Sequence, residues 1–144
     1  NIERYKQARF HYEQCLEKFP ESPRPCLKLG NYFLELDRRA EAREYYLKSL
    51  EKDPDYVESH NNLAVMAMQD GRFTEAADIL DSVIDLDPDY ANAHLNRGII
   101  ASDVEKNTRK ALRHFRAYID LDGPRSPSVR NWINDLEDEN NRPK

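Results

Sequence analysis

The chain has 144 residues and a formal net charge of −5, with 34% charged and 39% apolar side chains. The length suits one domain, and the low apolar fraction favours an elongated body over a globule closed around one centre. The acidic balance argues against a nucleic-acid groove or a polybasic membrane face, which need clustered Lys and Arg.

No stretch of the sequence approaches the roughly 20 consecutive apolar residues of a membrane span. The sequence therefore predicts a soluble protein, cytoplasmic or periplasmic, and leaves the compartment open. Two cysteines, Cys15 and Cys26, are too few for the disulfide framework of a small secreted domain. We expect both to be free and partly buried, with a bridge between them as the alternative.

One register recurs along the whole chain. Pro20, Pro54 and Pro88 stand at intervals of 34 residues, and the apolar residues between them follow helical spacing. A repeat of this length predicts pairs of helices. A second column keeps the same interval, with an alanine four residues ahead of a large residue in each unit: Ala8 with Tyr12, Ala42 with Tyr46, and Ala76 with Leu80.

This register divides the chain into six predicted segments. The first enters the repeat pattern at its second helix, so we expect something to precede it. In the fourth segment Ala111 lies 35 residues after Ala76, which indicates one inserted residue in the turn between its helices. The segments are a second helix of a truncated repeat (1–20), two full repeats (21–56 and 57–90), a repeat with an insertion (91–124), a capping helix (125–137) and a polar tail (138–144).

Residues that start or stop helices support these segments. Ser22 before Pro23 and Ser126 before Pro127 read as N-caps, each followed by a first-turn proline. Asp55 with Glu58 matches a capping box at the next helix start. Gly71 fits the left-handed residue that ends a helix.

The residues at fixed places in each unit resemble the tetratricopeptide repeat, whose pattern is W-x2-L-G-x2-Y, then A-x3-F, then P. Two units match it closely, and the third match is weaker. The residues at these places are Cys26, Leu29, Gly30, Phe33, Ala42, Tyr46 and Pro54, then His60, Leu63, Ala64, Ala67, Ala76, Leu80 and Pro88, then His94, Arg97, Gly98, Ala101, Ala111 and Phe115, with Gly123 and Pro124 near the last proline position.

The resemblance implies an all-α fold, a right-handed superhelical solenoid of stacked antiparallel helix pairs. It also implies a non-catalytic adaptor, in which the first helix of each unit lines a concave groove that binds a peptide or helix of a partner protein. Two alternatives stay open. The array could be a recruiting or regulatory part of a larger enzyme, or a scaffold that self-associates through the open ends of the solenoid.

Candidate groove residues follow from their places in the first helices. Asn62 and Asn96 occupy equivalent places and could form an asparagine ladder along a peptide backbone, since an amide both donates and accepts hydrogen bonds. The alternative is that the asparagines cap or bridge helices, and that the apolar candidates pack inside. The candidates are Arg24, Leu27, Lys28, Asn31, Asn61, Asn62, Val65, Met68, Asn92, Leu95, Asn96 and Ile99.

One known binding mode of the family is not expected here. A clamp for the acidic C-terminal tails of chaperones uses two Lys, one Arg and two Asn, and this chain keeps the asparagines but lacks all three cations. A terminal carboxylate would find little charge-assisted pairing. The matching positions are Leu27, Asn31, Asn62, Asn92 and Asn96.

We expect no catalytic residues, no cofactor and no metal ion. His60 and His94 take the aromatic place of successive repeats, where packing or a hydrogen bond is the default; shared zinc binding needs nitrogens closer than helix spacing usually allows. His11 and His114 lack a Cys or Asp at ligand spacing. Arg97 replaces the usual Leu, and either reaches into the groove or pairs with a neighbouring Asp or Glu.

Overall fold

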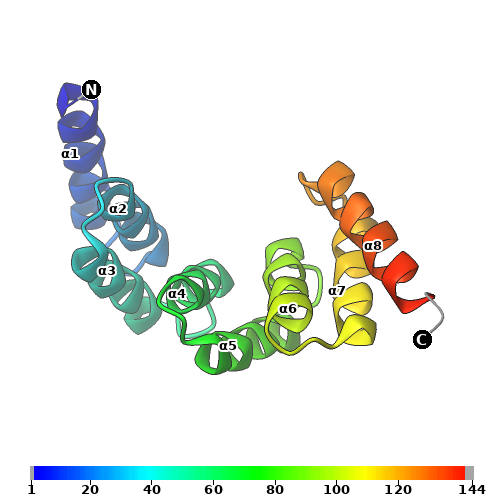
Figure 1. The fold of residues 1–144 in the computed structure, drawn as a ribbon. Helices are drawn as coiled ribbons and strands as arrows, with labels where there is room; N and C mark the ends of the chain where they lie inside the picture. The colour runs from blue at the N-terminus through cyan, green and yellow to red at the C-terminus, as the bar shows by residue number, and fades with distance from the viewer. Residues whose placement is uncertain (1, 142–144) are drawn as a thin grey trace. The chain divides into compact units, whose positions relative to one another are not determined.

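The computed structural model describes residues 2–141, which form eight helices and no strand (Figure 1). The predicted all-α fold class is confirmed. Asn1 and residues 142–144, the end of the predicted polar tail, lie outside the described residues. The helices are α1 Ile2–Lys18, α2 Pro23–Glu35, α3 Arg39–Lys52, α4 Val57–Gln69, α5 Phe73–Leu86, α6 Ala91–Asp103, α7 Thr108–Asp120 and α8 Ser126–Asn140.

The helices form two compact units, Asn1–Leu63 and Ala64–Lys144, and the division falls within α4. The last helix continues to Asn140, beyond the residue 137 at which the capping helix was predicted to end. Both cysteines are free thiols, as expected, with Cys15 half-buried and Cys26 buried.

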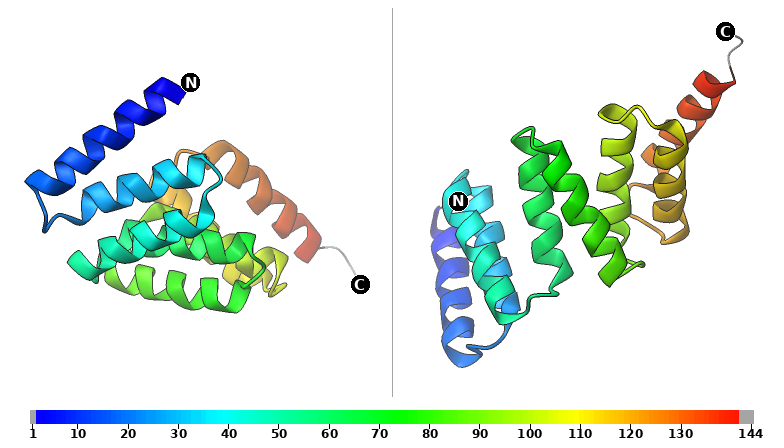
Figure 2. Two further views of the ribbon diagram at one scale, coloured as in Figure 1. Left: turned by 90° about the vertical axis from the view of Figure 1, so that its left-hand side faces the viewer. Right: turned by 90° about the horizontal axis from the view of Figure 1, so that it is seen from below.

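In the first unit, α2 and α3 form an antiparallel pair whose ribbons lie side by side in both views of Figure 2. Helical spacing places Leu29, Phe33, Ala42 and Tyr46 between them, and each is at most 4% exposed. Gly30 lies against the Tyr46 ring, so close that an added Cβ would come within 2.5 Å of a ring carbon. The absence of a side chain at Gly30 therefore sets how closely the two helices pack.

In the second unit, α6 and α7 form the equivalent pair, with Gly98 against the Phe115 ring at the same 2.5 Å. Helix α8 packs on α7, where Val129 is fully buried and the Trp132 ring centroid lies 5.6 Å from that of Phe115. Full burial of an aliphatic side chain such as Val129 contributes about 1.5–3 kcal/mol. The apolar face of α8 therefore holds it to α7.

The turns after α2, α4 and α7 share one backbone device, a residue in the left-handed region. Gly71 has φ of 75°, as predicted, and Asp37 and Asp122 adopt 58° and 53° at the ends of α2 and α7. The residue that follows then donates its N–H to a carbonyl five residues back, as Arg72 does to Ala67. This bonding satisfies the carbonyls that a helix end leaves free.

The inserted residue of the third repeat lengthens the turn after α6. Lys106 takes the left-handed conformation, with φ of 52°, and Asn107 donates its N–H to the Ala101 carbonyl, six residues back instead of five. The Asn107 side chain then accepts the Lys110 N–H at 3.0 Å and caps α7. The insertion is thus absorbed without a break in the helix pair.

Two of the three predicted helix starts are wrong. Ser22 does occupy the N-cap of α2, although its side chain makes no capping bond. Ser126 is instead the first residue of α8, and its hydroxyl donates to the Gly123 carbonyl. The capping box of Asp55 with Glu58 fails because α4 begins only at Val57, which leaves Asp55 outside the N-cap position.

The sequence Asp-Pro-Asp-Tyr occurs twice, at residues 53–56 and 87–90, and in each copy the side chain of the first Asp closes the turn. The Asp53 carboxylate accepts the Asp55 N–H at 3.1 Å, and the Asp87 carboxylate accepts the Asp89 N–H at the same distance. An Asp side chain that bonds to the backbone two residues on forms a turn of its own. The first Asp therefore bends the chain in each copy, between the end of one repeat and the start of the next.

Candidate functional site

The predicted groove residues of the first unit lie mainly on α2. Lys28 and Asn31 are one helical turn apart, and Glu35 follows one turn after Asn31 on the same face. Arg24 is exposed at the start of the helix, whereas Leu27 is only 7% exposed. The burial of Leu27 agrees with the alternative that the apolar candidates pack inside the protein.

Asn31 lies at the centre of a hydrogen-bonded cluster. Its side-chain oxygen accepts the Tyr46 hydroxyl at 2.8 Å and the Asn62 amide at 2.9 Å. Burial raises the pKa of the Tyr46 phenol to about 12, so the hydroxyl remains a donor at neutral pH. The structure thus brings two predicted site residues, Asn31 and Asn62, into direct contact, while Asn61 beside them is buried.

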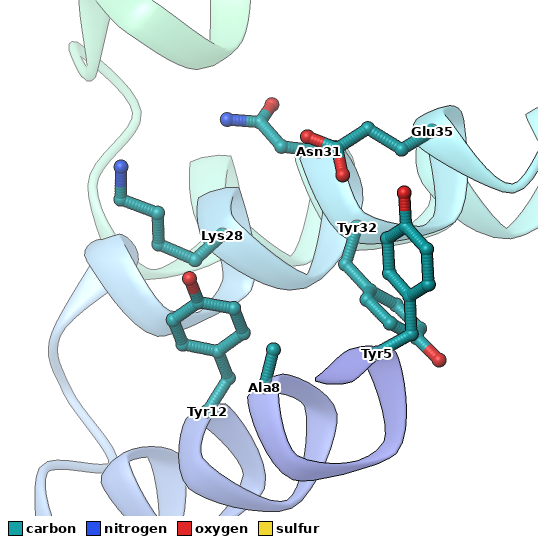
Figure 3. A pocket seen from close by; sticks show the side chains of 7 residues that line it. All are labelled: Tyr5, Ala8, Tyr12, Lys28, Asn31, Tyr32 and Glu35. Carbon is teal, nitrogen blue, oxygen red and sulfur yellow. The ribbon is translucent and has the colours of Figure 1, made fainter. Parts of the chain in front are cut away.

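The exposed side of Lys28, Asn31 and Glu35 borders an open hollow between α1 and α2, which we call the α1–α2 hollow (Figure 3). Its volume is about 450 Å³. The rings of Tyr5 and Tyr32 meet edge to face with centroids 5.9 Å apart. The α1–α2 hollow is lined by Tyr5, Ala8, Tyr12, Lys28, Asn31, Tyr32 and Glu35.

Five of these lining residues were absent from the predicted site: Tyr5, Ala8, Tyr12, Tyr32 and Glu35. The prediction assigned the groove to first helices, whereas α1 is read as a second helix. A usable signal was present in the sequence, because Tyr5, Ala8 and Tyr12 recur at intervals of three and four residues and mark one face of α1.

In the second unit the predicted residues lie on α4 and α6. Val65 and Met68 are half-buried on the last turns of α4. On α6, Asn92, Asn96 and Ile99 follow helical spacing along one face, with Asn92 exposed and the other two half-buried. Leu95 is 6% exposed and packs in the α6–α7–α8 core.

Ile99 also lines a second hollow, of about 450 Å³, between α6, α7 and α8, together with Phe115, Trp132 and Leu136. Asn62 and Asn96 belong to different units. The asparagine ladder that pairs them therefore stays a prediction.

Arg97 is a buried structural residue. Its side chain is 2% exposed, its Nε donates to the Asp81 carboxylate at 2.7 Å, and its Nη2 lies 2.9 Å from the Glu105 carboxylate. Burial opposes the charge, but the bonds to both carboxylates outweigh it and raise the pKa of Arg97 above its usual value. Of the two alternatives for Arg97, the structure has the intramolecular ion pair.

The second unit contains a contact between two histidines that was not predicted from the sequence. His94 and His114 are both buried, and their Nδ1 atoms lie 3.2 Å apart. His94 Nε2 lies 2.9 Å from the Pro88 carbonyl, so it is the protonated nitrogen and leaves Nδ1 as acceptor for His114. Burial first, and then the neighbouring His94, lowers the pKa of His114 to about 4.

His60 makes the same contact at the start of α4, where its Nε2 lies 2.7 Å from the Pro54 carbonyl. Both histidines therefore bond to the carbonyl of the proline that lies six residues before them. Among residues 2–141, no group of three or more His, Cys, Asp or Glu side chains is arranged to hold a metal ion. Over the same range no helix has both the length and the apolar character that a membrane crossing requires.

Comparison with known proteins agrees with this geometry. A family model described as tetratricopeptide repeat matches residues 27–91. No curated protein matches the chain by sequence at a significant level.

Solved structures extend the likeness to most of the chain. PilF of Pseudomonas aeruginosa is 23% identical with a TM-score of 0.80, over 96% of this chain and 63% of that one. The first tetratricopeptide domain of Spaghetti (RPAP3), solved with the HSP90 peptide SRMEEVD, is 19% identical with a TM-score of 0.72, over 82% and 94%. YrrB, described as having an unusual peptide-binding site, is 23% identical with a TM-score of 0.67, over 92% and 68%.

Stacked helix pairs of this kind define the class of helical-repeat protein-interaction modules. Within that class, residues 27–91 match the tetratricopeptide repeat family, and solved structures share the fold over most of the chain.

Proposed function

We propose that this chain is a non-catalytic adaptor that binds a segment of a partner protein along the exposed faces of its first helices. The observation that supports this most is the polar face of α2, where Lys28, Asn31 and Glu35 border the open α1–α2 hollow. Tyrosine rings beside amide and charged groups suit a peptide, because they offer apolar area and hydrogen bonds together.

The chemistry of this face favours recognition of a main chain over recognition of an acidic tail. Asn92 and Asn96 add amide groups on α6, and amides pair with a peptide backbone whatever its side chains are. The RPAP3 domain was solved with an acidic HSP90 peptide, but Leu27 stands here where the chaperone clamp has a cation. We therefore do not propose a chaperone tail as the ligand.

The asparagines provide the test. Partners would be captured with the wild-type chain, and the bound segment made as a synthetic peptide for titration by fluorescence anisotropy. We expect the Asn62→Ala, Asn96→Ala double variant to bind it at least about fivefold more weakly, since each lost amide contact costs about 0.5–1.5 kcal/mol. Asn131→Ala, on the exposed surface of α8, is the matched control. Equal affinity of the wild type, the double variant and the control would show that the two asparagines do not contribute to binding.

Because Asn62 also bonds to Asn31, the double variant needs a stability measurement beside the titration. Circular dichroism melting of the variants checks that a lost affinity is not a lost fold. A captured partner that binds the chain only when a catalytic domain is covalently linked to it would favour the alternative of a recruiting part of a larger enzyme.

A further inference from the structure

The hollow between α6, α7 and α8, which we call the α6–α8 hollow, has a polar counterpart in the first unit. In that counterpart the Asn31 oxygen accepts the Tyr46 hydroxyl at 2.8 Å and the Asn62 amide at 2.9 Å. In the repeat register, with its one inserted residue, Ile99 takes the place of Asn31 and Phe115 takes the place of Tyr46. Neither of these side chains can donate or accept a hydrogen bond, so an apolar floor replaces the polar cluster.

Trp132 completes this apolar floor. It stands eight residues after Pro124, as Asn62 does after Pro54. Its ring centroid lies 5.6 Å from that of Phe115, and the side chain is 36% exposed. An indole that stays partly exposed at the edge of a hollow of about 450 Å³ offers apolar area to a ligand.

The repeat also shows which face of a helix its successor covers. Gly98 on α6 lies against the Phe115 ring of α7, whereas Asn96, two residues earlier, is still partly exposed. On α8 the residues at the same distances from the preceding proline are Asn134 and Trp132. Residues two apart do not share a helix face, so a helix that followed α8 as α7 follows α6 would pack on the Asn134 side. The Trp132 side of the hollow would stay open.

Carboxylates surround the opening of the α6–α8 hollow. Asp103 on α6 and Asp135 and Glu139 on α8 line it, and all three are exposed. Within residues 2–141 none of the three forms an ion pair, and the described residues that line the hollow include no Lys or Arg. An apolar floor with a rim of uncompensated negative charge is complementary to a basic ligand.

The α6–α8 hollow continues the amide face of α6. Asn92, Asn96, Ile99 and Asp103 follow one another at intervals of four, three and four residues, so they lie along one side of the helix. Asn92 and Asn96 are the amides proposed above to pair with a peptide main chain. A segment that follows this side of α6 therefore reaches the hollow after the amides, where an apolar side chain can leave the solvent.

We propose that the α6–α8 hollow binds a basic segment of a partner protein, whose apolar side chain enters beside Trp132 while flanking Lys or Arg side chains pair with the rim carboxylates. This inference rests on the proposed function and names the chemistry of the partner at α6 and α8. A second copy of this chain is disfavoured as the occupant, because its net charge of −5 is repelled by the same rim.

The chain contains the reporter that the test needs. Trp132 is its single tryptophan, so the intrinsic fluorescence of the unlabelled protein reports events at the α6–α8 hollow. The probes are synthetic peptides without tryptophan, capped at both ends. The basic peptide has Leu-Phe at its centre with two lysines on each side. One comparison peptide has glutamates in place of the lysines, and the other has Ser-Ser in place of Leu-Phe.

We expect the basic peptide to change the emission of Trp132 on binding. The glutamate peptide should bind at least about tenfold more weakly, because like charges meet at the rim. The serine peptide should also bind at least about tenfold more weakly, because it buries no apolar side chain. Equal binding of the basic and glutamate peptides would overturn the proposal, and so would the absence of any response to the basic peptide up to millimolar concentration.

A triple variant tests the rim of the hollow. It neutralises exposed carboxylates without changing the apolar floor, by the substitutions Asp103→Asn, Asp135→Asn and Glu139→Gln. We expect the basic peptide to bind it about tenfold more weakly than the wild type, and high salt to close most of this gap, because exposed charges are screened. The matched control removes the same charge at exposed positions away from the hollow, by the substitutions Asp78→Asn, Asp85→Asn and Asp138→Asn. Equal weakening in both triple variants would mean attraction by net charge alone and would refute the proposal.

A filling variant tests the hollow itself. Ser102 lines the hollow, so Ser102→Phe should occupy it and weaken binding of the basic peptide at least about tenfold. Ser128→Phe, at an exposed position of α8, is the matched control. Circular dichroism melting checks both folds, and the rim variant decides the question if Ser102→Phe does not fold. Undiminished binding to a folded Ser102→Phe would place the peptide elsewhere and contradict the proposal.

Two further outcomes separate this inference from its alternatives. Dimerisation of the wild-type chain in sedimentation, abolished by the rim variant, would assign the hollow to a second copy and overturn the proposal. A captured partner that needs Asn62 and Asn96 but binds the rim variant as tightly as the wild type would also overturn it, and would leave the proposed function standing. A basic partner that needs the rim carboxylates but not the asparagines would support the inference and remove the asparagines from the proposed function.

Discussion

The helix pairs α2–α3 and α6–α7 pack in the same way but differ in the side chains that lie between the helices. Three equivalent places hold Cys26, Leu29 and Tyr45 in the first pair, where Leu29 is fully buried and Tyr45 stacks on a neighbouring ring. The same places hold two histidines and an arginine in the second pair: His94, Arg97 and His114.

The polar groups of the two pairs also differ in whether they border open space or form contacts only within their unit. In the first pair the cluster around Asn31 borders the open α1–α2 hollow. In the second pair the Arg97 guanidinium is 2% exposed and holds Asp81 and Glu105 within the unit. The repeat register thus fixes where helices pack, while individual substitutions decide whether a polar group is enclosed within the fold or borders open space.

The largest expected effect comes from replacing Gly98, the glycine at which α6 and α7 approach each other closely. Gly98→Val should cost ~3 kcal/mol or more of unfolding free energy, because its side chain would overlap the Phe115 ring. Urea denaturation followed by the fluorescence of Trp132, which lies against Phe115, measures the loss.

A compensating pair gives the control for this prediction. The double variant Gly98→Ala, Phe115→Leu copies the Ala64 and Leu80 combination and should recover most of the stability that Gly98→Ala loses alone. Additive losses in the double variant would mean that the ring is not what excludes a side chain at Gly98.

Arg97 tests whether buried charge in the second pair stabilises it. Arg97→Ala should lose about 2–4 kcal/mol by leaving a cavity. Arg97→Leu, which restores the residue type of Leu29, should be at least as stable as wild type, because an apolar replacement avoids the desolvation cost of the ion. Urea unfolding compares the variants, and equal losses for Ala and Leu would show that the pairs with Asp81 and Glu105 are net stabilising.

The histidine pair makes the second unit sensitive to pH. The pKa of His114 is lowered to about 4 in the folded chain from 6.5, so between these values the unfolded chain binds more protons. Stability is therefore fully present above pH 6.5 and falls as the pH is lowered, by about 2 kcal/mol at pH 5.

The matched variant is His114→Tyr, which installs the residue type of Tyr45 in the first pair. Unfolding free energies of both proteins at pH 7.5 and pH 5 isolate the contribution of the histidine, since other titrating groups are common to both. A loss between the two pH values that is the same in both proteins would contradict the prediction.

The smallest expected effect concerns the polar cluster of the first pair. Tyr46→Phe gives α3 the ring that α7 has in Phe115, and it removes one of the two donors to Asn31. The loss should be about 1 kcal/mol, because Asn62 still bonds to the Asn31 oxygen. Thermal melting of Tyr46→Phe beside Phe115→Tyr makes the comparison, and a loss above that of Gly98→Val would contradict it.

Much of the fold was predictable because its signals are local or periodic. The 34-residue interval, the helical spacing of apolar residues and the left-handed Gly71 each depend on a short window of sequence, and the structure has all three. The predicted starts at Asp55 and Ser126 failed because several polar residues near a helix start can close the turn, and the choice among them depends on the exact path of the backbone.

The candidate site was predictable only in part. Lys28 and Asn31 followed from their place in the first helix, but the tyrosines of α1 that complete the hollow did not, since α1 was read as a second helix with no groove role. The partner of His114 was also missed. It lies 20 residues away in the sequence, and no spacing rule pairs two histidines across a turn.

The sequence by itself determined the all-α class, the repeat, and the small and large residues that face each other between helices, because periodicity dictates which side chains share a helix face. Only the tertiary structure decided that Asn31 joins Tyr46 and Asn62, that Arg97 joins Asp81 and Glu105, and that Ala8 and Tyr12 border open space. Those contacts depend on how helices distant in sequence pack, which side-chain shape and burial settle together.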